Sequence, residues 1–268
     1  MRLGIAYNVF NGDELLLDSL KRLRKQASYI IITFQKLSNV GNKADESLTN
    51  VLQNIDRDLF DVIVEFIPNL SKSAKQNETD KRQLGLKFAR KSNCTHFMST
   101  DCDEFYCDNQ FEAAKELIIQ NGYKSTACEL VNYFHSSKYK MIEKTRYVPF
   151  IYEIGFFTRF NIKKKLYVNV DSSRVCRTDS FYLFQPEELL MHHMSYVRKN
   201  VNSMKSKLTN SPNYEKFESI INDYLDYYSA WTPNQPALNP HDFIQNNHVS
   251  NNIEIISSPI ILSVSFKR

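Results

Sequence analysis

The sequence has few glycines and lacks every common glycine-rich phosphate-binding motif. Only six of its 268 residues are glycine, none forms a G-x-G pair, and none immediately precedes Lys-Ser or Lys-Thr. A dinucleotide fingerprint, a kinase glycine loop and a P-loop are therefore excluded. The G-x-S-x-G motif of serine hydrolases is missing as well. Any phosphate that this protein binds has to be held by side chains or by a metal ion.

Cysteines and long hydrophobic runs are also scarce. The five cysteines include no C-x-x-C pair, which favours reduced thiols in a cytoplasmic protein over disulfides or a zinc ribbon. No apolar run reaches the roughly 18 residues of a membrane span, and the C-terminal run IEIISSPIILSVSF is interrupted by Glu254. The N-terminus does not have the pattern of a signal peptide. We expect a cytoplasmic protein, attached at most peripherally to the inner face of a membrane.

Neither sign of charge dominates the chain. The formal net charge is +4, and the basic residues are scattered, with short clusters such as the lysines at 163–165. Nucleic-acid-binding proteins more often carry a dense basic stripe, so we expect no nucleic-acid partner. Hydrophobic residues make up 42% of the chain and charged residues 24%. This composition is typical of a globular protein that folds without a disulfide or a structural metal.

Apolar segments of two kinds alternate through the first half of the chain. Strands are expected at 3–9, 29–34, 61–67 and 95–100, with helices at 13–24, 48–55 and 82–91. This alternation predicts an α/β fold with a mostly parallel central sheet that is covered by helices on both faces. In such sheets, ligands bind beyond the carboxyl ends of the strands.

The second half of the chain contains shorter and more mixed segments. Further strands, partly antiparallel, are expected at 124–131, 148–157, 166–170 and 181–184, followed by a tyrosine-rich helix at 214–228. On that helix, the spacing of Tyr224 and Tyr228 favours a packing face over an acceptor-stacking surface. We predict one catalytic domain over residues 1–200 and a helical C-terminal extension over 201–268.

An acidic motif directly follows the fourth expected strand. In extended backbone, Asp101 and Asp103 point to the same side while Cys102 points away. Two carboxylates that converge at a sheet edge suit Mg²⁺ or Mn²⁺. The alternative is a pair of turn-forming residues that cap a helix beginning near Gln110. A second D-x-D at 56–58 lies in a polar stretch and is expected at the surface.

A second polar segment, HHMSYVRKN, lies late in the chain. Imidazole suits Mn²⁺, so His192 or His193 is a candidate third metal ligand, and only one of them can face the site if the segment is extended. Arg198 and Lys199 are candidates for neutralising a diphosphate. The alternative is that the histidines pack on a loop and that the two basic residues are solvated.

Taken together, these motifs resemble those of GT-A-fold glycosyltransferases, of the bacterial family-2-like kind that act on nucleotide sugars. The resemblance covers residues 1 to about 200 and rests on NVFNGDELLLDSL, FQKLSNVG, NETDKRQLGLKFARKSNCTHFMSTDCDEFY and MHHMSYVRKN. It implies a nucleotide-sugar-binding half at about 1–105 and an acceptor-side half at 106–200. The third segment is the most specific of the four.

The resemblance also implies roles for individual residues. Tyr7 and Asn8 would hold the base and ribose of a UDP- or GDP-sugar, and Arg82 would contact the donor. Asp101 and Asp103 would bind ribose and metal, with Asp103 as the direct ligand of Mn²⁺ or Mg²⁺.

Two further positions follow from the resemblance, and one departs from it. Many family members have an acidic pair after the second strand, whereas this chain has Gln35, whose amide is still able to bond a pyrimidine. A late histidine, here His192 or His193, is a metal ligand in many members.

An inverting transfer also needs a carboxylate that takes the proton of the acceptor hydroxyl. The candidates are Asp171, which follows a short expected strand, Glu153, which lies between apolar neighbours, and Asp179. Asp171 is equally compatible with a turn or a helix cap, and burial of Glu153 would raise its pKa toward that of a base.

The resemblance therefore implies a metal-dependent hexosyltransferase, expected to be inverting, that uses a glycan or lipid-linked acceptor, as in bacterial surface-polysaccharide synthesis. A metal-dependent nucleotidyltransferase or phosphoester hydrolase would use the same carboxylates. A non-catalytic binding protein is the third alternative.

Overall fold

The computed structural model describes residues 1–10, 12–210, 214–244, 252–258, 260 and 262. Its strands are β1 Leu3–Val9, β2 Tyr29–Phe34, β3 Val62–Glu65, β4 His96–Asp101, β5 Glu104–Phe105, β6 Ser125–Phe134, β7 Tyr139–Met141, β8 Arg146–Glu153, β9 Phe181–Leu183, β10 Leu190–Tyr196 and β11 Ile253–Ile255. Its α-helices are α1 Asp13–Leu23, α2 Glu46–Asn54, α3 Ala74–Lys91, α4 Asp108–Asn121, α5 Val201–Thr209, α6 Tyr214–Phe217, α7 Ile221–Ala230 and α8 Pro240–Ile244. Short 3-10 turns lie at Arg57–Leu59, Ser172–Arg174 and Glu218–Ile220.

The strands form one mixed sheet with a parallel half. The order along the main path is β11-β7-β6-β8-β4-β1-β2-β3. Strands β1 to β4 are mutually parallel, with Asn8 beside Asp101 at their carboxyl ends. β8 runs antiparallel to β4, so Glu153 pairs with His96 at the opposite edge. The expected α/β fold with a mainly parallel central sheet flanked by helices is confirmed.

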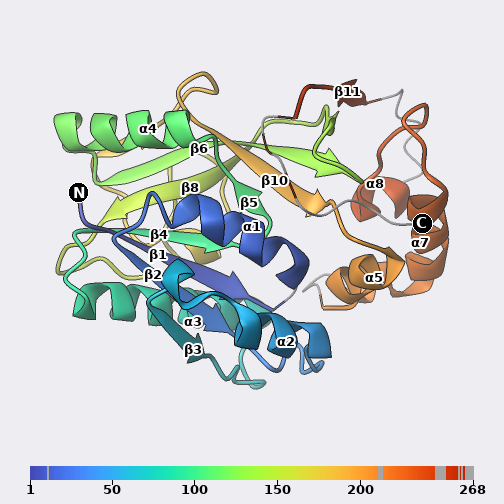
Figure 1. Ribbon diagram of the computed structural model, residues 1–268, viewed down its shortest axis with the longest axis horizontal. Helices are drawn as coiled ribbons and strands as arrows, with labels where there is room; N and C mark the ends of the chain where they lie inside the picture. The colour runs from blue at the N-terminus through green and yellow to red at the C-terminus, as the bar shows by residue number, and fades with distance from the viewer. Residues whose placement is uncertain (11, 211–213, 245–251, 259, 261, 263–268) are drawn as a thin grey trace.

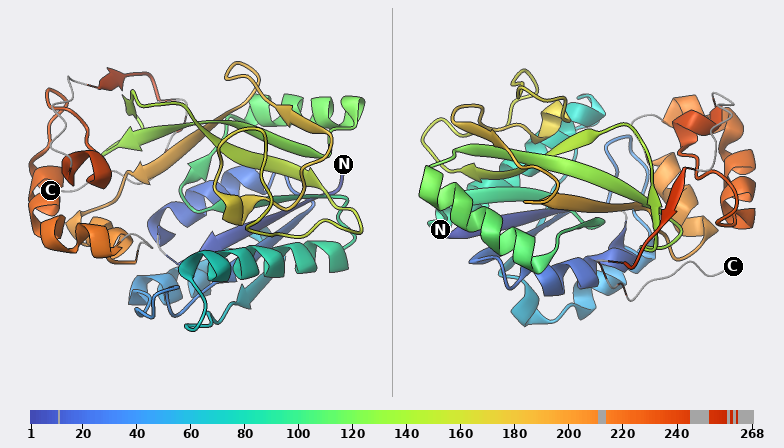
Figure 2. Two further views of the ribbon diagram at one scale, coloured as in Figure 1. Left: turned by 180° about the vertical axis from the view of Figure 1, so that it is seen from behind. Right: turned by 90° about the horizontal axis from the view of Figure 1, so that it is seen from above.

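Helices cover both faces of the sheet, with α1 and α4 on one face and α3 on the other (Figures 1 and 2). Alternate residues of β1 pack against the helices on the two faces of the sheet. Ile5 packs in the core beneath α1, and Ala6 packs against α3. A Cβ on Gly85 would lie 2.5 Å from the Cβ of Ala6. Glycine at position 85 therefore allows α3 to approach β1 closely.

The C-terminal helices gather at one end of the molecule, beyond β6 and β10 (Figure 1). They have a hydrophobic core of their own, in which Phe134 of β6 packs against Tyr228 and Trp231. Tyr224 and Tyr228 are fully buried, so the expectation of a packing face is confirmed. Among the described residues, no helix is long and apolar enough to cross a membrane.

Several elements differ from the sequence-based expectation. The strand expected at 148–157 ends at Glu153, and a 3-10 turn at Glu218–Ile220 divides the helix expected at 214–228. The helix expected at 82–91 begins at Ala74, because Ser73 and Gln76 form a capping box. Residues 166–170 form no strand, since their apolar alternation meets no partner strand and Tyr167 is 90% exposed. The HHMSYV segment is strand β10, which lies between β5 and β6.

Candidate functional site

A cavity of about 240 Å³ opens at the carboxyl edge of β1, β2 and β4. We call it the charged pocket, because its lining includes seven ionisable residues: Glu78, Asp101, Asp103, Lys81, Arg82, Arg198 and Lys207. Four of the seven are cationic. The parallel strands lead into the acidic motif, and α3 supplies three of the charged side chains. The segment that follows β10 and helix α5 close the pocket with the remaining two.

Asp101 is held between two arginines. Nη2 of Arg82 donates to both carboxylate oxygens at 3.3 Å, and Nη1 of Arg174 lies 3.7 Å away. Burial acts to raise the pKa of Asp101, but these two guanidinium groups hold it below its usual value. Asp101 therefore stays ionised at neutral pH.

Asp103 has different partners although it lies only two residues away. Nη2 of Arg198 donates to its Oδ2 at 2.7 Å, and Nε2 of His193 lies 3.6 Å from its Oδ1. Burial would raise the pKa of Asp103, but His193 and Arg198 hold it well below its usual value. Cys102 between the two acids is buried in the hydrophobic core. Both aspartates thus face the pocket.

The two adjacent histidines of β10 point in opposite directions. Nδ1 of His192 lies 2.8 Å from the hydroxyl of Tyr133, in a buried position away from Asp103. Burial lowers the pKa of His192 to about 4, so that this side chain is neutral. Because the strand is extended, only His193 faces the acidic motif. His192 is therefore not a candidate ligand for a metal ion bound by the acid pair.

The orientation of His193 is fixed by two further side chains. Nδ2 of Asn132 donates to Glu143 at 2.6 Å, which leaves its Oδ1 to accept from Nδ1 of His193 at 2.8 Å. The ring nitrogen that faces Asp103 is then Nε2, which carries the lone pair in the neutral form of the ring. Facing a carboxylate, this atom needs either a proton or a bound cation between the two groups.

The donor set fits a divalent cation only if the substrate supplies part of its coordination. Within the described residues, no three His, Cys, Asp or Glu side chains converge to hold a metal ion. Asp103 and His193 offer an oxygen and a nitrogen that face one another. Mg²⁺ in nucleotide sites is commonly held by one or two protein groups together with phosphate oxygens and water.

The uncharged end of the pocket is lined by Asn8 and Gln35. Nδ2 of Asn8 donates to Ser99 Oγ at 2.9 Å, while its buried Oδ1 has no partner among the described residues. Gln35 accepts from the Lys81 ammonium and donates through Nε2 to the carbonyl oxygen of Leu37. Both amides are therefore fixed in orientation by the fold.

Tyr7, the neighbour of Asn8, faces the other side of the sheet. Its hydroxyl lies 3.0 Å from Ser19 Oγ on α1, and its ring is fully buried. Since successive residues of a strand alternate, Asn8 and Tyr7 cannot both face the pocket. The structure brings Asn8 to the site and leaves Tyr7 in the core.

Three charged residues of the pocket were missed in the sequence. Burial lowers the pKa of Lys81 and of Lys207 to about 8, and burial raises the pKa of Glu78. Glu78 and Lys81 precede Arg82 by four and one residues on α3, so an i, i+3, i+4 pattern was available once the helix was extended to Ala74. The position of Lys207 on α5 carries no comparable signal.

A buried ion pair between Arg174 and Glu104 lies next to the acidic motif. Arg174 donates through both terminal nitrogens to Glu104, and its Nη2 also donates to the carbonyl oxygen of Ser99 at 3.0 Å. Glu104 also accepts from Thr100 Oγ1 at 3.0 Å. Arg174 thus ties the 3-10 turn Ser172–Arg174 to the end of β4.

The candidate catalytic bases lie at different edges of the sheet. Asp171 caps the 3-10 turn through Ser173 and adjoins the pocket, since Ser173 Oγ also lies 3.4 Å from Glu78. The Ser173 hydrogen bonds outweigh burial and lower the pKa of Asp171. Glu153 pairs with Arg177 at 2.7 Å and lies five residues back along β4, about 16 Å from Asp101.

Asp179 shares Arg177 with Glu153, at 2.6 Å from its Nε. It lies with Glu153 at the edge opposite the acidic motif. Neither carboxylate lines the charged pocket. Asp171 does not line it either, but of the three candidates it is the one linked to a pocket residue, since Ser173 Oγ donates to Asp171 and lies 3.4 Å from Glu78.

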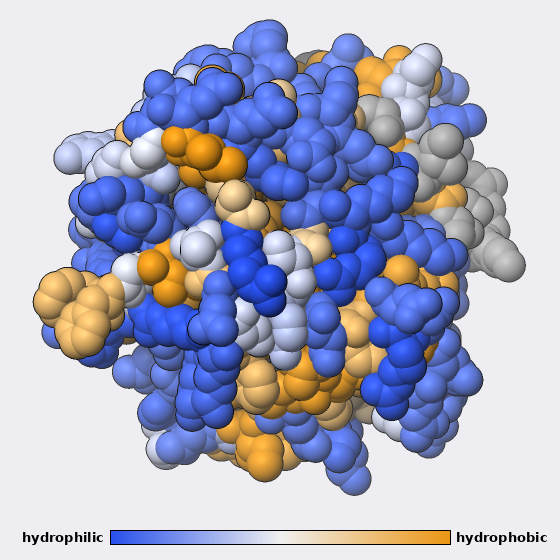
Figure 3. All heavy atoms as spheres, turned by 60° about the vertical axis from the view of Figure 1, so that its left-hand side comes forward, coloured by the Kyte–Doolittle hydropathy of each residue, from blue (hydrophilic) through white to orange (hydrophobic). Residues whose placement is uncertain are grey.

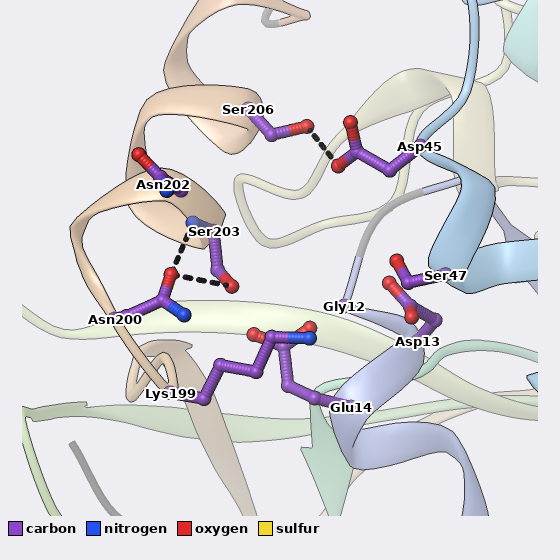
Figure 4. A pocket seen from close by; sticks show the side chains of 10 residues that line it. All are labelled: Gly12, Asp13, Glu14, Asp45, Ser47, Lys199, Asn200, Asn202, Ser203 and Ser206. Atoms are coloured by element: carbon purple, nitrogen blue, oxygen red, sulfur yellow. Dashed lines mark hydrogen bonds between the residues drawn. The ribbon is translucent and has the colours of Figure 1, made fainter. Parts of the chain in front are cut away.

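Lys199 lines a neighbouring cavity of about 200 Å³, which we call the acidic pocket. Its carboxylates come from Asp13, Glu14 and Asp45 at the starts of α1 and α2. Figure 4 shows Lys199 and Glu14 among the side chains that line it, and Ser206 of α5 bonded to Asp45 at 2.8 Å. Lys199 thus lies apart from Arg198, although the two residues are consecutive.

No family model and no curated protein matches this chain. Among solved structures, the chain is similar to S. aureus TarS 1–349, with 11% identity and a TM-score of 0.46, over 92% of this chain and 74% of that chain. The same piece of TarS in complex with UDP-GlcNAc matches with 12% identity and a TM-score of 0.45, over 92% and 74%. Of a longer TarS chain, this chain spans 46%, about half. A mannose-1-phosphate geranyltransferase from Thermus thermophilus has 12% identity and a TM-score of 0.33, over 58% of this chain and 51% of that chain. These likenesses are distant and concern the fold alone.

Proposed function

We propose that this chain is a glycosyltransferase that moves a sugar from a UDP- or GDP-sugar to a glycan or lipid-linked acceptor. The observation that carries the proposal is the charged pocket at the carboxyl edge of the parallel strands, where Asp101 and Asp103 lie among four cationic side chains. A nucleoside diphosphate needs hydrogen-bond acceptors for its ribose hydroxyls and cations for its phosphates. The charged pocket offers both within one cavity.

The nucleoside would bind at the uncharged end of the pocket. Asn8 lines this end of the pocket, and its side-chain amide would bond the base or ribose. Asp101, kept ionised by Arg82 and Arg174, is an acceptor for ribose hydroxyls. Gln35 would bond the base through its amide once Lys81 turns toward the phosphates.

The diphosphate would be neutralised by Lys81, Arg198 and Lys207. The two ammonium groups are desolvated in the free protein, and their pKa values of about 8 reflect that cost. A bound anion would give each of these two ammonium groups a favourable electrostatic interaction. Arg198, which already bonds Asp103, is fixed in position for a phosphate oxygen.

We further propose that Asp103 and His193 hold Mn²⁺ or Mg²⁺ when the donor is bound, with phosphate oxygens and water completing the shell. Such an ion supplies Lewis-acid stabilisation of the departing nucleoside diphosphate. Asn132 and Glu143 keep Nε2 of His193 directed at Asp103 for this purpose.

For an inverting transfer, we propose Asp171 as the carboxylate that takes the proton from the acceptor hydroxyl. Its lowered pKa keeps it ionised, and Ser173, which donates to it at 2.6 Å, also contacts Glu78 of the charged pocket. A cytoplasmic role in bacterial surface-polysaccharide synthesis agrees with the family that the sequence resembles. In the same proposal, residues 201–268 form an extension whose Lys207 completes the donor site.

Thermal-shift measurements with UDP-, GDP- and CMP-sugars, each with and without Mn²⁺, test this proposal. We expect one nucleotide sugar to raise the melting temperature, and Mn²⁺ to increase that shift. The Asp103→Asn variant should lose the Mn²⁺-dependent part.

The other outcomes of the same screen contradict the proposal. Stabilisation by a nucleoside triphosphate alone would favour a nucleotidyltransferase, and hydrolysis of a phosphoester without sugar transfer would favour a hydrolase. A wild-type protein that responds to no nucleotide would favour a non-catalytic binding protein. Product analysis by mass spectrometry separates transfer of the sugar from its hydrolysis.

A further inference from the structure

The segment that connects β8 to the 3-10 turn at Ser172 exposes large aromatic side chains. Phe156 is 92% exposed, Phe157 83% and Tyr167 90%. The two phenylalanine rings pack edge to face, 5.0 Å apart, and extend away from the core as one apolar tip. Figure 3 shows hydrophobic side chains that protrude from a largely hydrophilic surface. Exposed aromatic side chains that form such a tip suit an interface in which one side is apolar.

The tip is held out by a well-anchored base. Phe160 is buried and packs on Phe97 of β4, with ring centroids 6.0 Å apart. Thr158 Oγ1 accepts from the backbone N–H of Gly155 at 2.9 Å, and Arg90 of α3 donates to the carbonyl oxygen of Gly155 at 3.0 Å. The fold therefore keeps the aromatic tip in solvent although its neighbours are packed.

Basic residues surround the aromatic side chains. The stretch from 154 to 170 contains Arg159 and the lysines at 163–165, and no aspartate or glutamate. Lys164 lines both the hollow beside Phe156 and the hollow beside Tyr167. The aromatic and basic groups therefore lie along one surface, which we call the aromatic-basic surface. The ammonium of Lys164 donates to the carbonyl oxygens of Arg159 and Cys176, so the exposed cations of this surface are Arg159, Lys163 and Lys165.

The nearest carboxylates do not cancel this charge. Asp179 lines the hollow beside Phe156, but it is paired with Arg177 at 2.6 Å. The same arginine bonds Glu153 at 2.7 Å. Asp179 also lies 3.9 Å from Lys124, so Arg177 and Lys124 together balance the two carboxylates, and the positive charge of the aromatic-basic surface remains available to an anionic partner.

We propose that the aromatic-basic surface docks on a bilayer that contains anionic phospholipids. Phe156, Phe157 and Tyr167 would enter the headgroup region, where aromatic side chains are favoured, and the basic residues would contact the lipid phosphates. A soluble polyanion would satisfy the cations but would leave the phenylalanine tip in water. The combination of an apolar tip with cations favours a membrane surface.

Docking is independent of the proposed sugar transfer, but it would explain how a lipid-linked acceptor reaches the enzyme. The docking segment continues into Asp171 and Arg174, which adjoin the charged pocket. If the transfer proposal is correct, the membrane surface and the donor site are connected by this one segment.

Co-sedimentation of the full chain with lipid vesicles tests the inference. We expect binding to phosphatidylcholine vesicles that contain about one third phosphatidylglycerol, weaker binding to pure phosphatidylcholine, and release at high salt. The double variant Phe156→Ser/Phe157→Ser should reduce the partition coefficient at least about tenfold, because it removes the apolar tip. Lys163→Ser/Lys165→Ser should weaken binding about tenfold and flatten the salt dependence.

A matched control removes exposed apolar groups elsewhere. Ile67 is 76% exposed and Ile142 61%, and the variant Ile67→Ser/Ile142→Ser should bind vesicles as the wild type does. Nucleotide-induced thermal shifts of every variant report separately on the charged pocket, so failure of docking is distinguishable from failure of the transfer proposal.

Three results would overturn the inference. They are absence of binding to anionic vesicles, equal binding by the Phe156→Ser/Phe157→Ser variant, and equal loss in the Ile67→Ser/Ile142→Ser control. If polyphosphate in solution bound as tightly as vesicles, and independently of the phenylalanines, the surface would instead be a polyanion site.

Discussion

The charged pocket and the acidic pocket lie on the two sides of the connection between β10 and α5, and they differ in charge. The first has four cationic and three acidic side chains, and the second has one lysine and three carboxylates. Consecutive residues contribute to both, since Arg198 lines the first and Lys199 the second. Helix α5 also serves both, with Lys207 on one side and Ser206 on the other.

This difference separates two kinds of ligand. A diphosphate would gain from the cations of the charged pocket and would be repelled by three carboxylates in the acidic pocket. Local sequence alone assigns Arg198 and Lys199 the same partner, yet the fold sends them to opposite environments. Three experiments test whether the two pockets differ in function as they do in charge.

The largest effect is expected from Asp103→Asn. This change removes the carboxylate that faces His193 and bonds Arg198, while a side chain of the same size remains. Sugar transfer should fall on the order of 10²–10³-fold, because an electrostatic contribution to the leaving group is lost. Steady-state kinetics of transfer measure the effect, and circular dichroism checks that the fold is retained.

Asp13→Asn in the acidic pocket is the matched control for this experiment. The rate of sugar transfer should stay within about twofold of the wild type, since Asp13 does not line the charged pocket. Equal losses in the two variants would mean that the pockets act as one site.

A smaller effect is expected from a comparison of two lysines. Lys207→Met should weaken binding of the nucleoside diphosphate about tenfold or more, because a desolvated cation of the charged pocket is removed. Lys199→Met, which removes the same group from the acidic pocket, should leave the affinity nearly unchanged. Isothermal titration calorimetry measures both dissociation constants, and a reversed order would assign the diphosphate to the acidic pocket.

The smallest effect is a pH dependence. The ammonium groups of Lys81 and Lys207 attract a diphosphate only while they are protonated, and their pKa values lie at about 8. Nucleotide affinity should therefore fall several-fold as the pH rises from about 7 to about 9. Binding should also take up protons in this range, because the bound anion raises the pKa of both lysines.

The conservative variant Lys207→Arg sharpens the pH experiment. An arginine stays charged throughout this range, so the loss of affinity at high pH should become smaller. Calorimetry in buffers of different ionisation enthalpy counts the protons taken up. A flat affinity profile in the wild type would show that neither lysine contacts the diphosphate.

Much of the carboxyl edge could be predicted from the sequence. The apolar strand β4 ends at Asp101 and places the acids at the carboxyl edge. Asp103 lies in the turn that follows, so strand alternation alone does not determine the side to which it points. The same alternation explains why His193 and not His192 faces Asp103, but it decides between them only once the register of β10 is known. The helical face that carries Lys81 and Arg82 was readable from the capping box at Ser73.

The rest of the site depends on contacts between distant segments. Arg174 meets Glu104 across 70 residues of sequence, and no local pattern predicts that pairing. Lys207 reaches the pocket because α5 packs beside the sheet edge, which depends on tertiary structure. The strand predicted from apolar alternation at 166–170 is wrong, because no neighbouring strand is available there and Tyr167 stays in solvent.

The position of Lys207 on α5 has a consequence for how the charged pocket forms. Strands β1 to β4 and the acidic motif are synthesised within the first 103 residues, but two of the four cations arrive only at positions 198 and 207. A chain folded only as far as the acidic motif would hold the two aspartates without half of the cations of the charged pocket. The full positive charge of the pocket therefore depends on the packing of α5 beside the sheet edge, whereas the acid pair needs only β4 and the turn that follows it.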